Sequence, residues 1–356
     1  MEQTMKNKKY ILILTILLSV VFTTETFAGN PAKRGTSGAQ ELLLSVGGRG
    51  TALSGASISL STGLDAIHWN PAGLAGGFTN SNVEALFSST DYIEDVGINY
   101  AGVGINVTDF GVVAFSLKSL SFGDIPVTTE SFPDGTGDTY SPSFITLSAS
   151  YSKQLTDRIA VGFTTKFISE NIQRTSAVGF AVDAGVIYKV ASGTAFDGLR
   201  FGVVLKNIGP NMQFEGADLE EMKIPNNSDP SAQQMPFRYV SQAFELPSTF
   251  EMGLSYDYLV QDEITISPMV AFQSVNFGDD QFKIAGEINY ANFIYARGGF
   301  SFQDNSTDEV IYVEGPTFGF GLNYSLGSSV LGFDYSLSKV SVFDGGNHTI
   351  ALKVTF

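Results

Sequence analysis

The fold is decided by the stretch HTIALKVTF, residues 348–356, at the carboxyl end of the sequence. From Ile350 to Phe356 every second residue is apolar, and the residues between them are small or polar. Successive side chains of a β-strand point to opposite faces, so this pattern predicts a strand with one apolar and one polar face. Such a strand belongs between an apolar and a polar environment.

The same alternation recurs along the chain, in stretches of roughly ten residues that end at turn signals. Residues 331–338 alternate Leu, Phe and Tyr with Gly, Asp and Ser, and residues 250–258 alternate Phe, Met, Leu and Tyr with Glu, Gly, Ser and Asp. We expect fourteen strands, at residues 82–88, 95–107, 110–119, 143–154, 158–170, 177–190, 199–208, 247–259, 262–274, 280–290, 293–302, 316–326, 329–338 and 346–356.

This pattern predicts an all-β fold, a 14-stranded antiparallel transmembrane β-barrel, with the even strand number of bacterial outer-membrane barrels. Side chains can fill a barrel of about eight strands, whereas a larger barrel encloses a lumen. The apolar face is therefore expected to meet lipid. A charge on that face near the bilayer midplane costs roughly 2–4 kcal/mol, so charged strand residues are expected to face the lumen. They are Asp183, Lys206, Glu251, Asp257, Glu287, Asp334 and Lys353.

The lengths of the connections support the barrel. If the carboxyl end is periplasmic, the periplasmic turns are at residues 108–109, 156–157, 191–198, 260–261, 291–292 and 327–328. All but one of these are short. The long connections fall on the other side, at residues 120–142, 209–246 and 303–315. Short periplasmic turns and long extracellular loops are typical of outer-membrane barrels.

The first residues have the pattern of an export signal. Three lysines at positions 6 to 9 precede an apolar run at residues 10–22, and the small residues Thr26 and Ala28 complete a cleavage site. We expect residues 1–28 to be a signal peptide cleaved near Ala28. The mature chain is then expected in the outer membrane, in contact with its lipid. The terminal Phe356 resembles the carboxyl-terminal signal that the barrel-assembly machinery reads.

Composition excludes several functions. The formal charge of −16 argues against a nucleic-acid partner, because phosphate binding needs basic patches. The absence of Cys excludes disulfides and thiolate metal sites. The sequence has two His, His68 in the N-terminal region and His348 in an expected surface turn, without the spacing of metal ligands or a nucleophile motif. We therefore expect no metal, no cofactor and no catalysis.

Residues 29–80 lack the alternation and are expected to form a plug, with the barrel over residues 81–356. A Gly-rich stretch at 46–50 and small residues at 51–61 allow close backbone packing, and Asn70-Pro71 marks a turn. Some large barrels close their lumen with a plug.

Two motifs in this segment carry a family resemblance. The first is Arg49-Gly50, followed by Ala52 and Gly55. The second is the block His68-Trp69-Asn70-Pro71-Ala72-Gly73-Leu74. Together they resemble the N-terminal signature of the PorV/PorQ family, which is similar to FadL-type transporters with an Asn-Pro-Ala motif in their hatch. Further matches lie at residues 121–126, 151–158, 206–210 and 246–256.

The resemblance implies a fourteen-stranded barrel in the outer membrane. The PorV branch, which belongs to type IX secretion, carries substrates with a carboxyl-terminal signal domain from a translocon to an attachment complex. This chain departs from that branch at Gly48, where the branch has an acidic residue, and at Gly73, where it has Lys. Both departures concern the shuttle role and not the barrel.

Two functions remain open. The first is protein secretion through binding of a translocon or cargo by the loop 209–246, since exposed Met and Phe make adaptable contacts. Its apolar residues are Met212, Phe214, Met222, Met235, Phe237 and Phe244. This loop has a second interpretation, in which it folds over its own barrel mouth. The second function is a FadL-like conduit for small hydrophobic molecules, for which the same loop is a capture site and Asn70-Pro71-Ala72 belongs to the plug.

Overall fold

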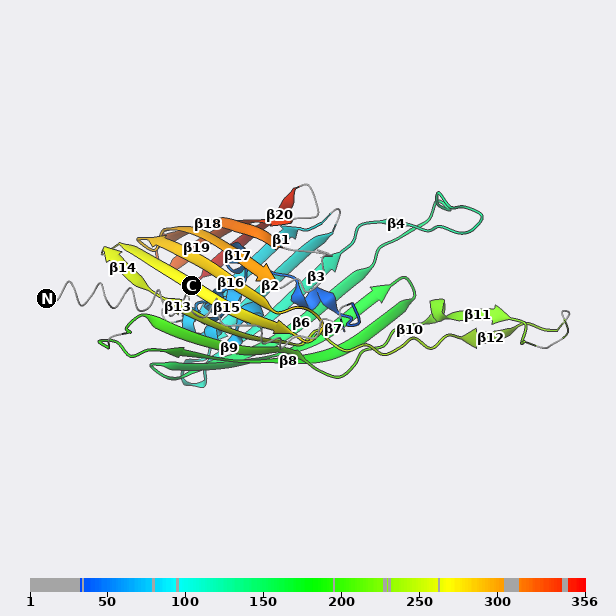
Figure 1. Cartoon of the computed structure of the whole chain (residues 1–356), viewed down its shortest axis with the longest axis horizontal. Helices are drawn as coiled ribbons and strands as arrows, with labels where there is room; N and C mark the ends of the chain where they lie inside the picture. Colours follow the sequence, from blue (N-terminus) through cyan, green and yellow to red (C-terminus); the bar gives the residue numbers. More distant parts are fainter. Residues whose placement is uncertain are drawn as a thin grey trace.

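The chain forms a single closed barrel in its computed structural model (Figure 1). In the described part of the chain, fourteen antiparallel strands pair in sequence order, and the first pairs with the last. The expected export signal at residues 1–28 lies outside the described residues. The structure describes residues 33, 35–78, 81–93, 96–194, 196–226, 229, 232–261, 263–303, 314–340 and 345–356.

The fourteen expected strands are confirmed, and their ends differ from the expected ones by at most three residues. Differences of three residues occur at the end of the first strand, predicted at residue 88 and found at Asp91, and at the end of the strand predicted to finish at residue 259, found at Tyr256. The barrel strands are β1 (Val83–Asp91), β2 (Gly97–Asn106), β3 (Val112–Ser121), β6 (Ser143–Thr156), β7 (Ile159–Ile172), β8 (Thr175–Lys189), β9 (Leu199–Ile208), β13 (Thr249–Tyr256), β15 (Ile264–Val275), β16 (Gln281–Tyr290), β17 (Ile294–Gln303), β18 (Glu314–Leu326), β19 (Ser329–Val340) and β20 (Gly346–Thr355).

The two faces of the wall separate apolar from polar side chains as expected. Phe115 and Phe318 point outward and are 59% and 58% exposed, which suits a surface in contact with lipid. Five of the seven expected lumen charges are buried inside: Asp183, Lys206, Glu251, Glu287 and Asp334. Lys353 also faces inward, 3.5 Å from Asp65 of the N-terminal segment.

The strand expected at residues 247–259 is interrupted at Asp257, where β13 ends and β14 (Tyr258–Gln261) begins. Asp257 is therefore not a wall residue, and it pairs with Arg200 at 2.5 Å. Tyr256, expected on the lipid face, is buried in a small cluster that includes Phe196. The reason is that the connection after β8 folds back onto this strand, where the Asp257 amide donates to the carbonyl of Gly198 at 3.0 Å.

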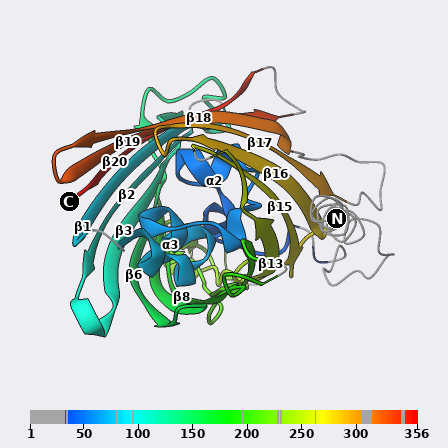
Figure 2. The ribbon, with the colours of Figure 1, turned by 90° about the vertical axis from the view of Figure 1, so that its left-hand side faces the viewer.

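The N-terminal segment, residues 35–78, lies inside the ring of strands (Figure 2). It contacts the inner face of every barrel strand, with Arg49 providing the contact to β16. None of the helices described in this structure is long and apolar enough to cross a membrane. The elements of the segment are short: η2 (Gln40–Leu43), α2 (Gly48–Ala52), η3 (Ser57–Ser59), η4 (Gly63–Asp65), α3 (Ala66–Trp69) and η5 (Pro71–Phe78).

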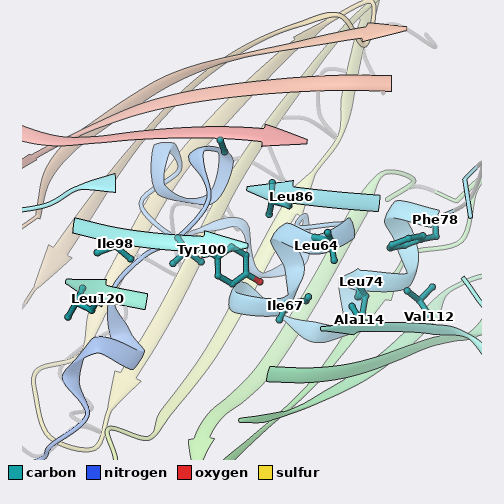
Figure 3. Packing of buried hydrophobic residues seen from close by; sticks show 12 residues of the cluster. Leu64, Ile67, Leu74, Phe78, Leu86, Ile98, Tyr100, Val112, Ala114 and Leu120 are labelled. Carbon is teal, nitrogen blue, oxygen red and sulfur yellow. The ribbon is translucent and has the colours of Figure 1, made fainter. Parts of the chain in front are cut away.

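The apolar core lies between this segment and the wall, not within the wall itself. In the largest cluster, Leu64, Leu74 and Phe78 of the segment pack on Leu86 and Ile98 of the first two strands (Figure 3). A second cluster surrounds Leu53 and Ile58, against β9 and β15. Fully burying a side chain of this size contributes about 1.5–3 kcal/mol, so the segment is held firmly.

The two ends of the barrel differ. The turn end carries Phe356 and the short connections, including η6 (Thr108–Phe110) between β2 and β3. The loop end carries residues 122–142 and 209–248, which project from the same side of the barrel (Figure 1). Both contain short strands, and the second also a 3-10 helix, that the sequence pattern did not predict. They are β4 (Ile125–Pro126), β5 (Thr139–Tyr140), β10 (Glu215–Gly216), η7 (Ala217–Leu219), β11 (Glu220–Lys223) and β12 (Met235–Arg238).

Candidate functional site

Asn70 joins the N-terminal segment to the wall. It follows α3 and is fully buried. Its side-chain amide donates to the carbonyl of Ile58 at 3.0 Å and lies 3.4 Å from the carbonyl of Val186 in β8. Its side-chain oxygen accepts from the backbone amide of Ala72 at 3.1 Å. Because buried polar groups are costly without partners, these bonds fix two parts of the segment against β8.

Glycines of the wall leave the space that this block occupies. A β-carbon at Gly185 in β8 would lie 2.0 Å from Oδ1 of Asn70. A β-carbon at Gly162 in β7 would lie 2.3 Å from the carbonyl oxygen of Pro71. Atoms cannot approach so closely, so the fit of the block depends on the absence of both side chains.

The two departures from the family signature have a related cause. A β-carbon at Gly73 would lie 2.0 Å from the carbonyl oxygen of Ser61, and one at Gly48 would lie 2.8 Å from Cβ of Asp334. Neither a lysine at residue 73 nor an acidic residue at residue 48 fits this backbone. The carboxylate that binds Arg49 comes from the wall instead.

Arg49 of α2 holds the segment to the wall by charge. Its Nε and Nη2 donate to the two carboxylate oxygens of Glu287 in β16, at 3.0 and 2.8 Å. Arg297 in β17 also donates to Glu287, at 2.6 Å, and to Asp334 in β19. Burial lowers the pKa of Arg49, but the adjacent Glu287, with the nearby carboxylates of Asp65 and Asp334, raises it by more, so the pKa lies above its ordinary value. The charges of two guanidinium groups and two carboxylates thus balance in one buried network.

Trp69 packs between two glycines of the first motif. A β-carbon at Gly50 would lie 2.0 Å from Nε1 of the indole, and one at Gly55 would lie 2.6 Å from Cζ3. Gly55 also has a φ of +71°, which favours glycine. The ring of His68 meets the indole edge to face, with centroids 4.8 Å apart. Burial lowers the pKa of His68 well below its ordinary value, and nearby lysines lower it further, so the imidazole is neutral.

A cavity of about 350 Å³ remains between the segment and the wall. Lys206 and Glu251 meet at its wall side, 2.6 Å apart. Trp69 and His68 line its other side. Most lining residues are polar or charged, whereas pockets for apolar ligands are lined predominantly by hydrophobic side chains. The remaining polar wall residues are Gln273, Gln281, Lys283, Ser301 and Gln303.

The inner part of the loop 209–248 folds back on the barrel mouth, so the expected exposure of Met212 is wrong. Met212 is 1% exposed and packs with Leu42 of the segment and Ile168 of β7. Its backbone exchanges two hydrogen bonds with Phe244, at 2.9 and 2.8 Å. Phe214 and Phe244 are half-buried against the same cluster. These three residues belong to the support of the loop and not to its free surface.

The outer part of the same loop is exposed. Met222 and Met235 are each 55% exposed, and Phe237 is 41% exposed. They lie on β11 and β12, which project beyond the barrel (Figure 1). The neighbouring loop presents Phe132, which is also exposed. The structure therefore divides the six expected contact residues into three that anchor the loop and three that are available to a partner.

His348 was expected in a surface turn, but it lies on the outer face of β20. Its Nδ1 is 2.8 Å from the hydroxyl of Tyr335. Phe356 lies at the closing seam, where its amide donates to the carbonyl of Val83 at 2.9 Å. Among the described residues, no group of three or more His, Asp or Glu is placed to hold a metal ion.

Two wall residues that the sequence pattern did not single out are Lys118, which binds the segment, and Arg297, which binds Glu287 and Asp334 within the wall. Nζ of Lys118 in β3 donates to the carbonyl oxygens of Glu41 and Leu44, at 2.5 and 2.6 Å. Both residues occupy inward positions of their strands. Their place in the alternation is the signal that could have identified them, as it did for Glu287.

Comparison with protein families agrees with this architecture. The family model described as Type IX secretion system protein PorV matches residues 29–234, which is more than half of the chain. A search of curated protein sequences found no significant match.

Two solved structures share the fold. The deltaS2S3 mutant of the monoaromatic hydrocarbon channel TodX superposes with a TM-score of 0.53 and 14% identity, over 86% of this chain and 97% of that one. The Pseudomonas putida toluene transporter TodX gives 0.52 and 13%, over 85% and 96%. At such low identity the similarity concerns the fold alone.

Proposed function

Because the chain belongs to the PorV family of type IX secretion system proteins, we propose that it is a docking barrel for cargo or translocon in the outer membrane. The mature chain begins after Ala28, the turn end faces the periplasm, and the loop end faces outward. The short connections at the turn end and the long loops opposite support this orientation. The barrel-assembly machinery would recognise Phe356 as its carboxyl-terminal signal.

The N-terminal segment acts as a plug in this proposal. It contacts all fourteen strands, and Arg49, Asn70 and Lys118 bond it to different parts of the wall. A polypeptide would have to displace these contacts to pass through the barrel. Partners are therefore bound at the surface and not carried through the lumen, and the barrel has no catalytic role.

The observation that carries the docking role is the exposed outer part of the loop 209–248. Met222, Met235 and Phe237 project into solvent, although burying them would be favourable. The inner part of the loop, through Met212 and Phe244, is anchored on the barrel. An anchored base with an exposed apolar tip is suited to binding another protein.

The test is purification of the tagged full-length protein from native outer membranes in mild detergent, with mass spectrometry of what accompanies it. Replacing residues 219–239 by a short Gly-Ser linker should abolish recovery of secreted proteins or of a translocon barrel. The matched control replaces residues 127–138 of the neighbouring loop and should keep most of that recovery. Unchanged recovery after the first replacement would contradict the proposal.

The conduit for small hydrophobic molecules is less well supported. The shared fold with TodX favours it, but the cavity beside Lys206 and Glu251 is polar, and an apolar ligand there would leave these groups poorly solvated. We expect no saturable binding of fatty acids or aromatic hydrocarbons to the purified barrel. Saturable binding of one of them, displaced by its analogues, would restore the conduit.

A further inference from the structure

β11 and β12 form a two-stranded ribbon that stands apart from the barrel (Figure 1). All eight residues of the two strands are exposed. The register pairs Glu220 with Arg238 and Met222 with Pro236, and no third strand of the described residues joins them. An isolated two-stranded hairpin is only marginally stable in water, so a further strand would stabilise it.

The two edges of this ribbon are not equivalent. The amide of Tyr239 donates to the carbonyl of Leu219 at 2.8 Å, which shows that Tyr239 points its backbone groups toward β11. Backbone direction alternates along a strand, so Pro236 and Arg238 point theirs away from β11. Pro236 has no N–H, and a proline on an edge blocks pairing with another strand. The free edge of β12 is therefore blunted at its centre.

The edge of β11 is open instead. Met222 lies opposite Pro236, so its N–H and C=O both point away from β12. The carbonyl of Glu220 points the same way, while its backbone amide donates to the carbonyl of Ala217. Three backbone groups thus face solvent in the geometry of a strand that lacks one neighbour.

The surroundings of this edge are acidic. Residues 209–248 contain six acidic and two basic residues, and residues 122–142 contain four acidic residues and no basic one. The lysine of β11, Lys223, is already bound by Glu221 at 2.7 Å and by the hydroxyl of Tyr239. Glu220 has no ion pair within the described residues. A polypeptide on this edge therefore meets uncompensated negative charge.

We propose that β11 pairs with the exposed edge strand of a β-sheet partner that carries Lys or Arg beside that strand, so that the ribbon extends the partner's sheet. This inference rests on the proposed docking role of the loop end and names the partner's chemistry. Backbone bonds to Met222 supply affinity, and a basic side chain opposite Glu220 supplies selectivity. Pro236 restricts pairing to one side, so the ribbon takes one strand and does not propagate.

Two matched proline variants of the full-length protein separate the edges. Met222→Pro removes an outward N–H from the open edge, and Arg238→Pro removes one from the blunted edge. Neither N–H bonds across the ribbon, so both changes leave its internal ladder intact. In purifications from native outer membranes, Met222→Pro should lower partner recovery about tenfold through lost main-chain bonds, and Arg238→Pro should change it less than about twofold. Met222→Ala, which keeps the backbone groups, should retain more partner than Met222→Pro.

A separate variant tests the contribution of negative charge to partner binding. Glu220→Gln should lower recovery and weaken its dependence on salt, since screening acts on this unpaired charge. Unchanged recovery and salt dependence would overturn the requirement for a basic partner.

The outcomes distinguish this inference from the docking role. Equal recovery with Met222→Pro and Arg238→Pro, together with loss on replacement of residues 219–239, would reject strand pairing and leave the docking loop in place. Full recovery without residues 219–239 would reject both. A recovered partner without an exposed edge strand would also overturn the inference.

Discussion

At the scale of the residue, a single methyl group at Gly185 should be destabilising, because its β-carbon would overlap Oδ1 of Asn70. Overpacking of this kind costs about 1–3 kcal/mol, so Gly185→Ala should lower the free energy of unfolding by that amount. Gly286 on the outer face has nothing within 4 Å, and Gly286→Ala is the matched control. Unfolding in urea, followed by the fluorescence of the one tryptophan, Trp69, measures both. Equal midpoints would contradict the packing at Asn70.

His68 makes the attachment of the segment depend on pH. Its pKa in the folded protein lies below the ordinary value of 6.5, so the folded state binds fewer protons than the unfolded state near that pH. The stability it contributes is fully present above pH 6.5 and is lost as the pH falls toward the folded pKa.

We therefore expect His68→Gln to lose less stability than the wild type between about pH 7 and about pH 5. His348→Gln, on the outer face, should keep the wild-type profile. Urea unfolding at a series of pH values is the measurement. Parallel profiles for His68→Gln and the wild type would show that the buried imidazole makes no such contribution.

At the scale of the element, the buried network attaches α2 to β16, β17 and β19. Arg49→Met would leave Glu287 with Arg297 alone, and breaking a buried pair costs about 3 kcal/mol or more. Arg174→Met is the control, since Arg174 pairs with Asp218 but its side chain is 75% exposed, and such pairs contribute at most about 1 kcal/mol. Acrylamide quenching of Trp69 should increase in Arg49→Met only. Equal quenching in both variants would mean that the network does not hold the segment.

The barrel strands could be predicted because each separates lipid from a polar interior. Apolar and polar residues therefore alternate along each strand. β11 and β12 could not, because both of their faces meet solvent and no alternation results. The helices of residues 40–78 are too short for a periodic pattern. Their position depends on glycines such as Gly162 and Gly185, whose role appears only when the wall and the segment are seen together.

The candidate site was partly predictable from the sequence. Asn70 and Arg49 were identified as residues of the segment, and the structure shows that they bond to the wall. Met212 was expected among exposed loop residues, but it is buried by Leu42 and Ile168, which are distant in sequence. Composition marks a loop as apolar and does not show which of its residues return to the barrel.

At the scale of the whole molecule, three surfaces have different surroundings. The outer wall is apolar and meets lipid, the interior is filled by residues 35–78, and the loop end is acidic with exposed Met and Phe. A barrel filled in this way suits the proposed docking at its loop end. The chain has no cysteine, so a single introduced one can report where a partner lies.

The most direct measurement is crosslinking from one introduced cysteine in native outer membranes. Val240→Cys lies at the loop end and Leu155→Cys at the turn end, and both positions are exposed. With a short bifunctional reagent, secreted or translocon proteins should be captured from residue 240 and not from residue 155. Capture from residue 155 alone would contradict docking at the loop end, because the partner would then contact the periplasmic side.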